Sequence, residues 1–538
     1  MLKLPWHHML ADKMNRVPAN RQTFNEAAKQ VRNRLRRYRA DSIAQQAMDR
    51  LHQGNQKSRI DELKSWPWLS LLLVKLVLED ATISIDKGED CPQAVFEYCL
   101  QVLWDAQGSR ERMDDGPGKV YLMVRSVIQA QMPFQIRPTV DFLRWPALVA
   151  RLPAGHSCRE LFRRCFAVEP EVFMQITYMA HAPVLNDELL IGPDYFAPVR
   201  TALGADVDHV LNFFSRSLEQ LRTELHGRRQ GQIANGQLAR PHHELNEPPW
   251  LMRYPLLLRG GGFRAVWHPS VFTRGMEQAV HRRMSEYGGD YSNEFGRVFE
   301  QYVLELLADA GIEYLSEDAY KQVVGRDKNA VEAIISRDGV NVYVEAKLTV
   351  YSEDLAQHTH GPKVWQALRQ VRRAMDQAWK VSELLRQPGL PDWGCTKAAE
   401  DILIIVTSQP PFCATGEHFK RIFKDDVFDP TMLALRKQPT PTAAHLKNLP
   451  LASIILTSIG EWEHLMGCVR RGEIDLVPFL REVARANLDP VSSVMVIDQH
   501  IEKYVTKWAL PTLLQTAKDE TELKIVRMLG GSEADLVN

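Results

Sequence analysis

Residues 330–347 read AVEAIISRDGVNVYVEAK, which is two β-rich runs on either side of Asp338-Gly339. An Asp-Gly pair between such runs is the strongest short-range signal for a hairpin with a two-residue type I′ turn. That turn fixes the register of the two strands, so that Glu332 falls directly opposite Glu345. We therefore expect two carboxylates to meet on one face of a sheet.

The two faces of this hairpin differ in character, because side chains alternate along a strand. Lys347 shares the acidic face and stands two residues, or roughly 7 Å, beyond Glu345. We expect the opposite face to be the buried side, because it is apolar throughout: Val331, Ala333, Ile335, Val342, Val344, Ala346 and Leu348.

The facing acids need a positive neighbour. Like charges directly opposite each other destabilise a β pair, with Cβ atoms only about 4.5–5.5 Å apart. Lys347 meets part of this need, but two carboxylates with room for water suit Mg²⁺ or Mn²⁺, which prefer hard oxygen ligands. The sequence therefore predicts a divalent cation at Glu332 and Glu345.

The helix expected at 293–310 offers a third carboxylate. Its apolar stripe includes Phe299 and Val303, and Glu300 lies beside that stripe. Glu294 points about 240° away at 100° per residue, so both acids cannot address one site equally well. We favour Glu300.

The order of predicted elements indicates a mixed α/β fold. A glycine-turn hairpin at 254–267 precedes them. The elements then follow as a helix at 293–310, strands at 319–324, 330–336 and 340–348, a helix at 363–385, a strand at 401–408, a strand at 451–457 and a helix at 461–471.

Taken together, Glu300, the strand acid Glu332 and the Glu345-Ala-Lys347 triplet resemble the motifs of the PD-(D/E)XK nuclease superfamily. The resemblance covers about residues 291–410. It implies a restriction-endonuclease-like α-βββ-α-β core and a Mg²⁺-dependent endonuclease that hydrolyses phosphodiester bonds of DNA. More loosely, the segments around it are similar to bacterial phage-defence proteins, which implies antiviral defence and a phage-derived protein as trigger.

The resemblance also implies roles for single residues. Glu332 and Glu345 would be metal ligands, with Glu300 as an auxiliary ligand. Lys347 would position the attacking water or stabilise the charge that develops on the phosphorus. Gln366 or Gln370, on the following helix, would support them.

One departure from the family pattern leaves alternatives open. The first strand acid is usually Asp, whereas this chain has Glu332, and Asp327 is a conceivable substitute outside the strand. A nuclease fold that binds nucleic acid or a protein without cutting it is one alternative. An enzyme that cuts RNA such as tRNA is another, because the same metal chemistry serves both polymers.

The first 245 residues are predicted to be a helical sensor or docking region. A linker is expected at 227–249, where three Gly and three Pro occur, and 246–538 would hold the nuclease-like domain with its C-terminal α/β extension. Six of the eleven residues from 29 to 39 are basic and none is acidic. If exposed, this run would attract phosphates through Arg32, Arg36 and Arg37, although a solvated helix face is the other interpretation.

Length, composition and charge limit the number of domains, the way nucleic acid could bind and the compartment of the protein. The 538 residues, 45% hydrophobic and 25% charged, are typical of a soluble protein of roughly two to four domains. A net charge of −1 means that any nucleic acid must bind to local basic patches. Seven cysteines without a C-x-x-C pair favour reduced thiols in a cytoplasmic protein. The longest apolar run, at 69–78, has ten residues and is interrupted by Lys75, whereas a membrane span needs about 20 apolar residues.

Overall fold

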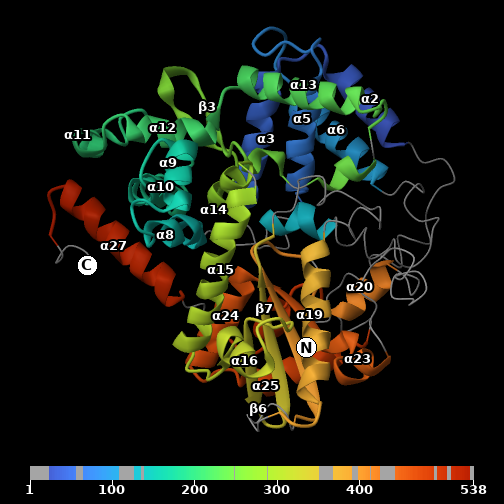
Figure 1. The fold of residues 1–538 in the computed structure, drawn as a ribbon. Helices are drawn as coiled ribbons and strands as arrows, with labels where there is room; N and C mark the ends of the chain where they lie inside the picture. Colours follow the sequence, from blue (N-terminus) through green and yellow to red (C-terminus); the bar gives the residue numbers. More distant parts are fainter. Residues whose placement is uncertain are drawn as a thin grey trace.

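The computed structural model describes residues 23–55, 65–107, 127–134, 139–240, 242–247, 249–287, 289–349, 368–390, 398–411, 413–423, 443–489, 494–505 and 510–532. Over these ranges the protein is a mixed α/β structure, mainly helical, with two small sheets (Figure 1). The predicted fold class is confirmed at this level.

A bundle of helices forms the N-terminal part: α2 (Phe24–Leu35), α3 (Ala40–Asn55), α5 (Pro67–Glu79), α6 (Gln93–Ala106) and α13 (Leu218–Ala234). The apolar run at 69–78 lies inside α5, every residue of which from Pro67 to Leu78 is buried. The other four helices all contact α5. A helix that is apolar on nearly all sides, with Lys75 as its buried charge, is stable in water only when neighbours cover it, and this packing provides that cover.

The middle of the chain contains α8 (Arg144–Ala150), α9 (Ser157–Phe166), α10 (Pro170–Leu185), α11 (Arg200–Leu203), α12 (Asp206–Phe214) and α14 (Pro269–Ser285). The first sheet lies beside them in the order β1 (Leu190–Ile191), β4 (Arg264–Val266), β3 (Leu256–Leu258) and β2 (Ser215–Arg216). Strands β3 and β4 are antiparallel around the Gly260–Gly262 turn, so the hairpin predicted there is confirmed.

The second sheet has the order β5 (Leu315–Ser316), β6 (Ala333–Arg337), β7 (Val340–Lys347), β8 (Glu400–Thr407) and β9 (Ile454–Ser458). The first three strands are antiparallel, whereas β8 and β9 continue in parallel with β7. The predicted turn is confirmed, because Asp338 and Gly339 have φ of 54° and 72°. The predicted register is confirmed as well, with Arg337 paired to Val340.

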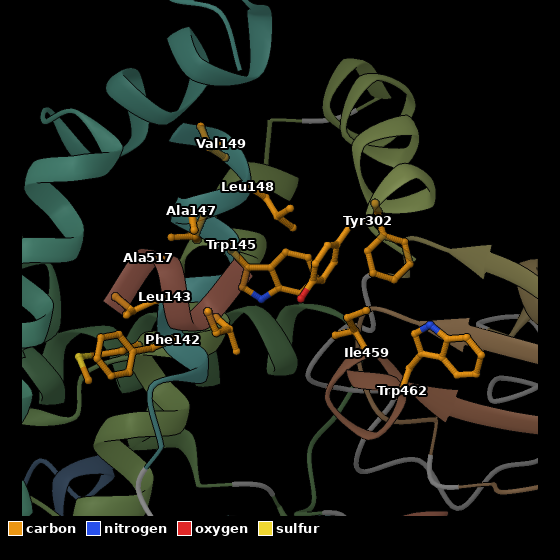
Figure 2. Packing of buried hydrophobic residues seen from close by; sticks show 14 of the residues in the cluster. Phe142, Leu143, Trp145, Ala147, Leu148, Val149, Tyr302, Ile459, Trp462 and Ala517 are labelled. Atoms are coloured by element: carbon orange, nitrogen blue, oxygen red, sulfur yellow. The ribbon is translucent and has the colours of Figure 1, made fainter. Parts of the chain in front are cut away.

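Helices cover both faces of this sheet. α15 (Gly289–Asp309) and α24 (Ile459–Arg470) pack on one face, and α19 (Arg369–Leu385) packs on the other. Figure 2 shows Trp145 of α8, Tyr302 of α15 and Trp462 of α24 gathered in the core on the first face. The remaining helices are α16 (Glu317–Val324), α20 (Gly416–Phe423), α23 (Ala443–Asn448), α25 (Leu476–Ala486), α26 (Asp498–Ile501) and α27 (Thr512–Met528).

The apolar face of the hairpin is buried as predicted, because most of its side chains belong to the core cluster shared with α15 and α24, but the predictions for Val331 and for 319–324 are wrong. The acidic face is also buried, because Ile334 and Tyr343 beside the acids pack against α19. Val331 packs in that same cluster, not with the apolar face. In addition, 319–324 is helix α16, which begins after the N-cap Ser316, and not a strand.

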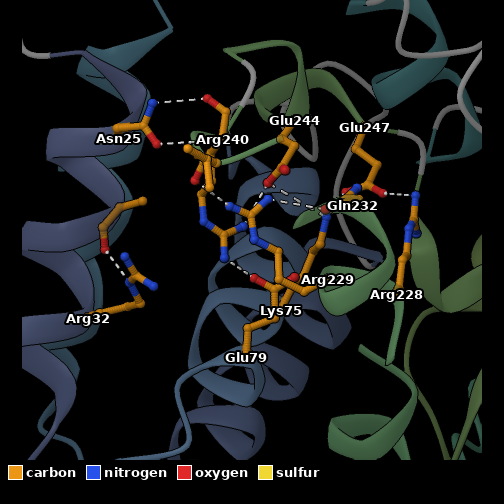
Figure 3. Close-up of polar contacts among 12 residues, drawn as sticks. Asn25, Arg32, Lys75, Glu79, Arg228, Arg229, Gln232, Arg240, Glu244 and Glu247 are labelled. Carbon is orange, nitrogen blue, oxygen red and sulfur yellow. Dashed lines mark hydrogen bonds and ion pairs between the residues drawn. The ribbon is translucent and has the colours of Figure 1, made fainter. Parts of the chain in front are cut away.

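The predicted linker is also wrong, because 227–249 is built into the helical bundle. Its first residues are the second half of α13, and Arg240, Glu244 and Glu247 that follow are buried among charges from α5. Lys75 pairs with Glu247, and Arg240 pairs with Glu244 at 2.8 Å and with Glu79 (Figure 3). Two hydrophobic clusters include residues from both sides of position 245, so packing is continuous there.

Candidate functional site

The end of β7 carries the acidic site. Glu345 is completely buried because β7 is an inner strand, with β6 on one side and β8 on the other. Ala333 pairs with Val344, so the next residues in register are Glu332 and Glu345, although Glu332 lies just before β6 begins. The hairpin therefore brings the two predicted acids to the same face.

Lys347 lies between the two carboxylates. Its Nζ is 2.5 Å from Glu345 Oε2 and 3.7 Å from Glu332 Oε1. The contact with Glu345 is close but poorly aligned, so neither oxygen of Glu345 accepts a well-formed hydrogen bond from the residues that the structure describes. A buried carboxylate in that condition keeps unused ligand capacity.

Burial makes this site hold protons tightly. The pKa of Glu332 is raised to about 8, first by burial and then by the charge of Glu345. The pKa of Glu345 is raised to about 7 by burial, against the opposing effect of Lys347. Burial lowers the pKa of Lys347, but the adjacent carboxylates outweigh it and raise the value above normal.

Glu300 belongs to the same cluster of charges. It projects from α15, and its pKa is raised by burial and lowered by Lys347, which places the two within electrostatic reach. It also raises the pKa of both Glu332 and Glu345. Glu294 instead acts on Cys158 of α9, in agreement with the preference for Glu300.

Sequence reasoning missed Glu317, a further acid at this site. It is the first residue of α16, its backbone N–H donates to Glu332 O at 3.2 Å, and its charge raises the pKa of Glu332 and Glu345. Lys321 pairs with its carboxylate. The signal was present in Ser316-Glu317, because Ser followed by acids is typical of a helix start.

The donor set suits a hard divalent cation in its chemistry. The charges of Glu300 and Glu317 raise the pKa of Glu332 and Glu345, whose carboxylates contact the Lys347 ammonium, and a cation of higher charge would relieve this repulsion. Glu332 and Glu345 are the acids that would hold it. Within the described ranges, however, no three acid, His or Cys side chains are close enough to form a ready-made metal site.

A second missed group holds the ends of β7 and β8 in place. His281 of α14 is fully buried, and its Nε2 lies 3.1 Å from both Ser408 Oγ and Thr349 O. Ser408 Oγ donates to Thr349 O at 2.7 Å, which joins the residues that follow the two strands. Burial lowers the pKa of His281 to about 4, so the ring is neutral and this polar junction fixes the backbone two residues beyond Lys347.

No described contact joins Gln370 or Asp327 to the carboxylates. Gln366 is outside the described residues, and Gln370 accepts a hydrogen bond from Arg373 of its own helix at 3.5 Å. Asp327, the alternative strand acid, is 82% exposed and pairs with Lys328. The structure thus brings Glu332, and not Asp327, to Lys347.

The three arginines of the predicted basic patch, Arg32, Arg36 and Arg37, each contact a different group of the protein. Arg32 is half-buried and donates to Ala28 O at 3.3 Å. Arg36 donates to Asp80 at 3.2 Å, and Arg37 lies over the Tyr38 ring at 4.8 Å. All three side chains therefore already have a partner within the protein.

No family model, curated protein or solved structure matches this chain. None of the helices in the described part of the chain is long and apolar enough to cross a membrane.

Proposed function

We propose that the chain is a nuclease of the PD-(D/E)XK type, which hydrolyses phosphodiester bonds of DNA with Mg²⁺ or Mn²⁺. The observation that supports this most strongly is the position of Lys347, within 4 Å of the fully buried Glu345 and the partly buried Glu332, which meet across a type I′ turn. The elements α15, β5, β6, β7, α19 and β8 follow the order of the α-βββ-α-β core expected for such a nuclease, with the short helix α16 between β5 and β6.

The residues have separate tasks in this proposal. A bound divalent ion would polarise the phosphodiester and lower the pKa of a water molecule. Glu345 and Glu332 would hold the ion, and Glu300 would support them. Lys347 would orient the attacking water or stabilise the charge that develops on the phosphate oxygens, because its raised pKa keeps the ammonium charged.

One observation favours a second candidate, a nuclease fold that binds nucleic acid or a protein without cutting it. Lys347 is already paired with Glu345, and the described residues present no three-ligand cluster. In this case the ammonium would take the place of the cation permanently. A role in antiviral defence with a phage-derived trigger is part of the first proposal and comes from the sequence resemblance alone.

Cleavage assays separate these functions. The purified protein is incubated with supercoiled plasmid and, separately, with tRNA, in Mg²⁺, Mn²⁺ or EDTA. We expect plasmid cleavage that EDTA abolishes and that Lys347→Ala or Glu345→Gln lowers by at least about 100-fold. Lys380→Ala is the matched control, because this lysine of α19 is exposed and pairs with Asp376 of its own helix.

Each other result has a defined meaning. Equal products from the wild type and Lys347→Ala would show that a contaminant cuts the DNA, and would refute the proposed enzyme. Binding of DNA without cleavage in either metal would support the second candidate. Cleavage of tRNA alone, again dependent on Lys347, would assign the same chemistry to RNA.

A further inference from the structure

The surface of the helical bundle has an open hollow of about 670 Å³ between α2 and α6. In Figure 1 these helices lie at the upper right, whereas β6 and β7 lie at the bottom of the view. The hollow is lined by Glu26, Lys29, Gln30, Asn33, Arg34 and Tyr98. It is therefore distinct from the carboxylate site.

The helical repeat explains why α2 presents polar groups here. Its buried face is formed by Phe24, Ala27, Ala28, Val31 and Leu35. Lys29 and Asn33 are four residues apart, as are Gln30 and Arg34, so each pair shares one side of the helix. The hollow thus receives two cations and two amides on adjacent turns.

The opposite wall is an aromatic ring held in a fixed position. Tyr98 of α6 is 47% exposed, although its neighbours Phe96 and Cys99 are buried. Gln30 Nε2 donates to the Tyr98 hydroxyl at 2.6 Å, which fixes the ring beside α2. An exposed, oriented ring is a platform on which a base can stack.

Neither cation of the hollow forms an ion pair with a residue that the structure describes. No described carboxylate lies within 4.0 Å of Lys29 or Arg34, whereas the nearby Arg36 and Arg39 each pair with an aspartate. Glu26 also lines the hollow, but its carboxylate accepts from Thr23 N at 2.7 Å and Thr23 Oγ1 at 3.0 Å. That carboxylate caps the helix and leaves the positive charges available to an anion.

We infer that this hollow binds single-stranded nucleic acid, with a base on Tyr98 and the adjacent phosphates on Lys29 and Arg34. A single strand is required because only an unpaired base can stack on the ring. The inference rests on the proposed function for its choice of nucleic acid as partner. It assigns the helical bundle a docking role, away from the carboxylates. Lys29 and Arg34 take the place of the predicted Arg32, Arg36 and Arg37 as the residues that bind phosphate.

Anisotropy of a labelled oligothymidylate, measured in EDTA so that cleavage cannot occur, tests this site. Tyr98→Ala should weaken binding roughly 5- to 100-fold at every salt concentration, and Tyr98→Phe should stay within about twofold of the wild type because it keeps the ring. Lys29→Ala and Arg34→Ala should each lower the slope of log K against log salt by about 0.7. Tyr504→Ala, which removes another exposed tyrosine, is the control and should bind normally.

Absence of binding by the wild type, or equal binding by Tyr98→Ala and the wild type, would overturn the inference. Loss of the same size in Tyr504→Ala would overturn it too, because it would show a non-specific effect. The proposed function is tested apart from this, since it depends on cleavage and on Lys347. Binding that depends on Tyr98, together with no cleavage in the plasmid and tRNA assays, would support the binding site between α2 and α6 and refute the proposed nuclease activity.

Discussion

Glu345 is the residue of this site on which burial and neighbouring charges act most strongly against each other. Its carboxylate is fully buried, faces a second acid and lies against a lysine with poor alignment. A group in such surroundings resists ionisation, and perturbed acids of this kind gather at functional sites more often than elsewhere.

The raised pKa values predict how stability depends on pH. An acid whose pKa is higher in the folded state than in the unfolded state binds more protons when folded. The free energy of unfolding therefore falls as the pH rises above about 4.5, the ordinary pKa of a glutamate. The contribution of Glu345 is lost by about pH 7 and that of Glu332 by about pH 8, which are their pKa values in the folded protein. Without metal, this site should destabilise the protein in alkaline solution.

Glu332→Gln should reverse part of that effect. At about pH 8.5 in EDTA we expect the variant to be more stable than the wild type by roughly 1–3 kcal/mol, because it removes a charge that Glu345 repels. At about pH 5 the two proteins should differ little, since Glu332 is already protonated. Urea unfolding at both pH values measures the difference.

The exposed acid Asp327 supplies the control. Asp327→Asn should leave stability unchanged at either pH, because its side chain is 82% exposed. An equal effect of Glu332→Gln at both pH values would contradict the raised pKa.

Among the elements, the β6–β7 hairpin was the most predictable from sequence. The Asp338-Gly339 turn is a local signal that also sets the pairing, and so it determined which acids meet. Strand β5 has only two residues, Leu315 and Ser316, too few for a pattern, and α16 after it was mistaken for a strand. Burial of the acidic face depends on α19, a contact that no local pattern reports.

Gly339→Ala tests how strongly the turn holds the register. Gly339 has φ of 72°, where a Cβ is strained although no atom lies within 4 Å of it. We expect a loss of about 1–2 kcal/mol in the free energy of unfolding. Gly155→Ala is the matched control, because that glycine also has free space but no positive φ, and a similar loss there would contradict the explanation.

Across the whole molecule, a buried charge network joins segments that are far apart in the sequence. Arg144 of α8 is completely buried and binds Glu463 of α24 at 2.7 and 2.6 Å. It also contacts Glu277 of α14 at 2.9 Å, and Tyr302 of α15 donates to Glu463 at 2.6 Å. The Arg144–Glu463 contact alone spans 319 residues, so the sequence could not reveal that the middle helices and the second sheet share one core.

Arg144→Met should destabilise the protein by roughly 3–5 kcal/mol, because Glu463 would stay buried without its partner. Adding Glu463→Gln should restore part of the loss by removing that charge. Arg151→Met is the control and should cost less than about 1 kcal/mol, since its pair with Glu305 is exposed. Equal thermal midpoints for the Arg144 and Arg151 variants would refute a structural role for the network.

The central claim, that Glu332 and Glu345 hold a divalent cation beside Lys347, is tested most directly by anomalous diffraction from crystals soaked in Mn²⁺. We predict a peak roughly 2.0–2.3 Å from a carboxylate oxygen of each acid, with the Lys347 ammonium moved away from its present 2.5 Å contact with Glu345. Crystals at saturating Mn²⁺ that show no peak there, and an unchanged Lys347–Glu345 ion pair, would contradict it.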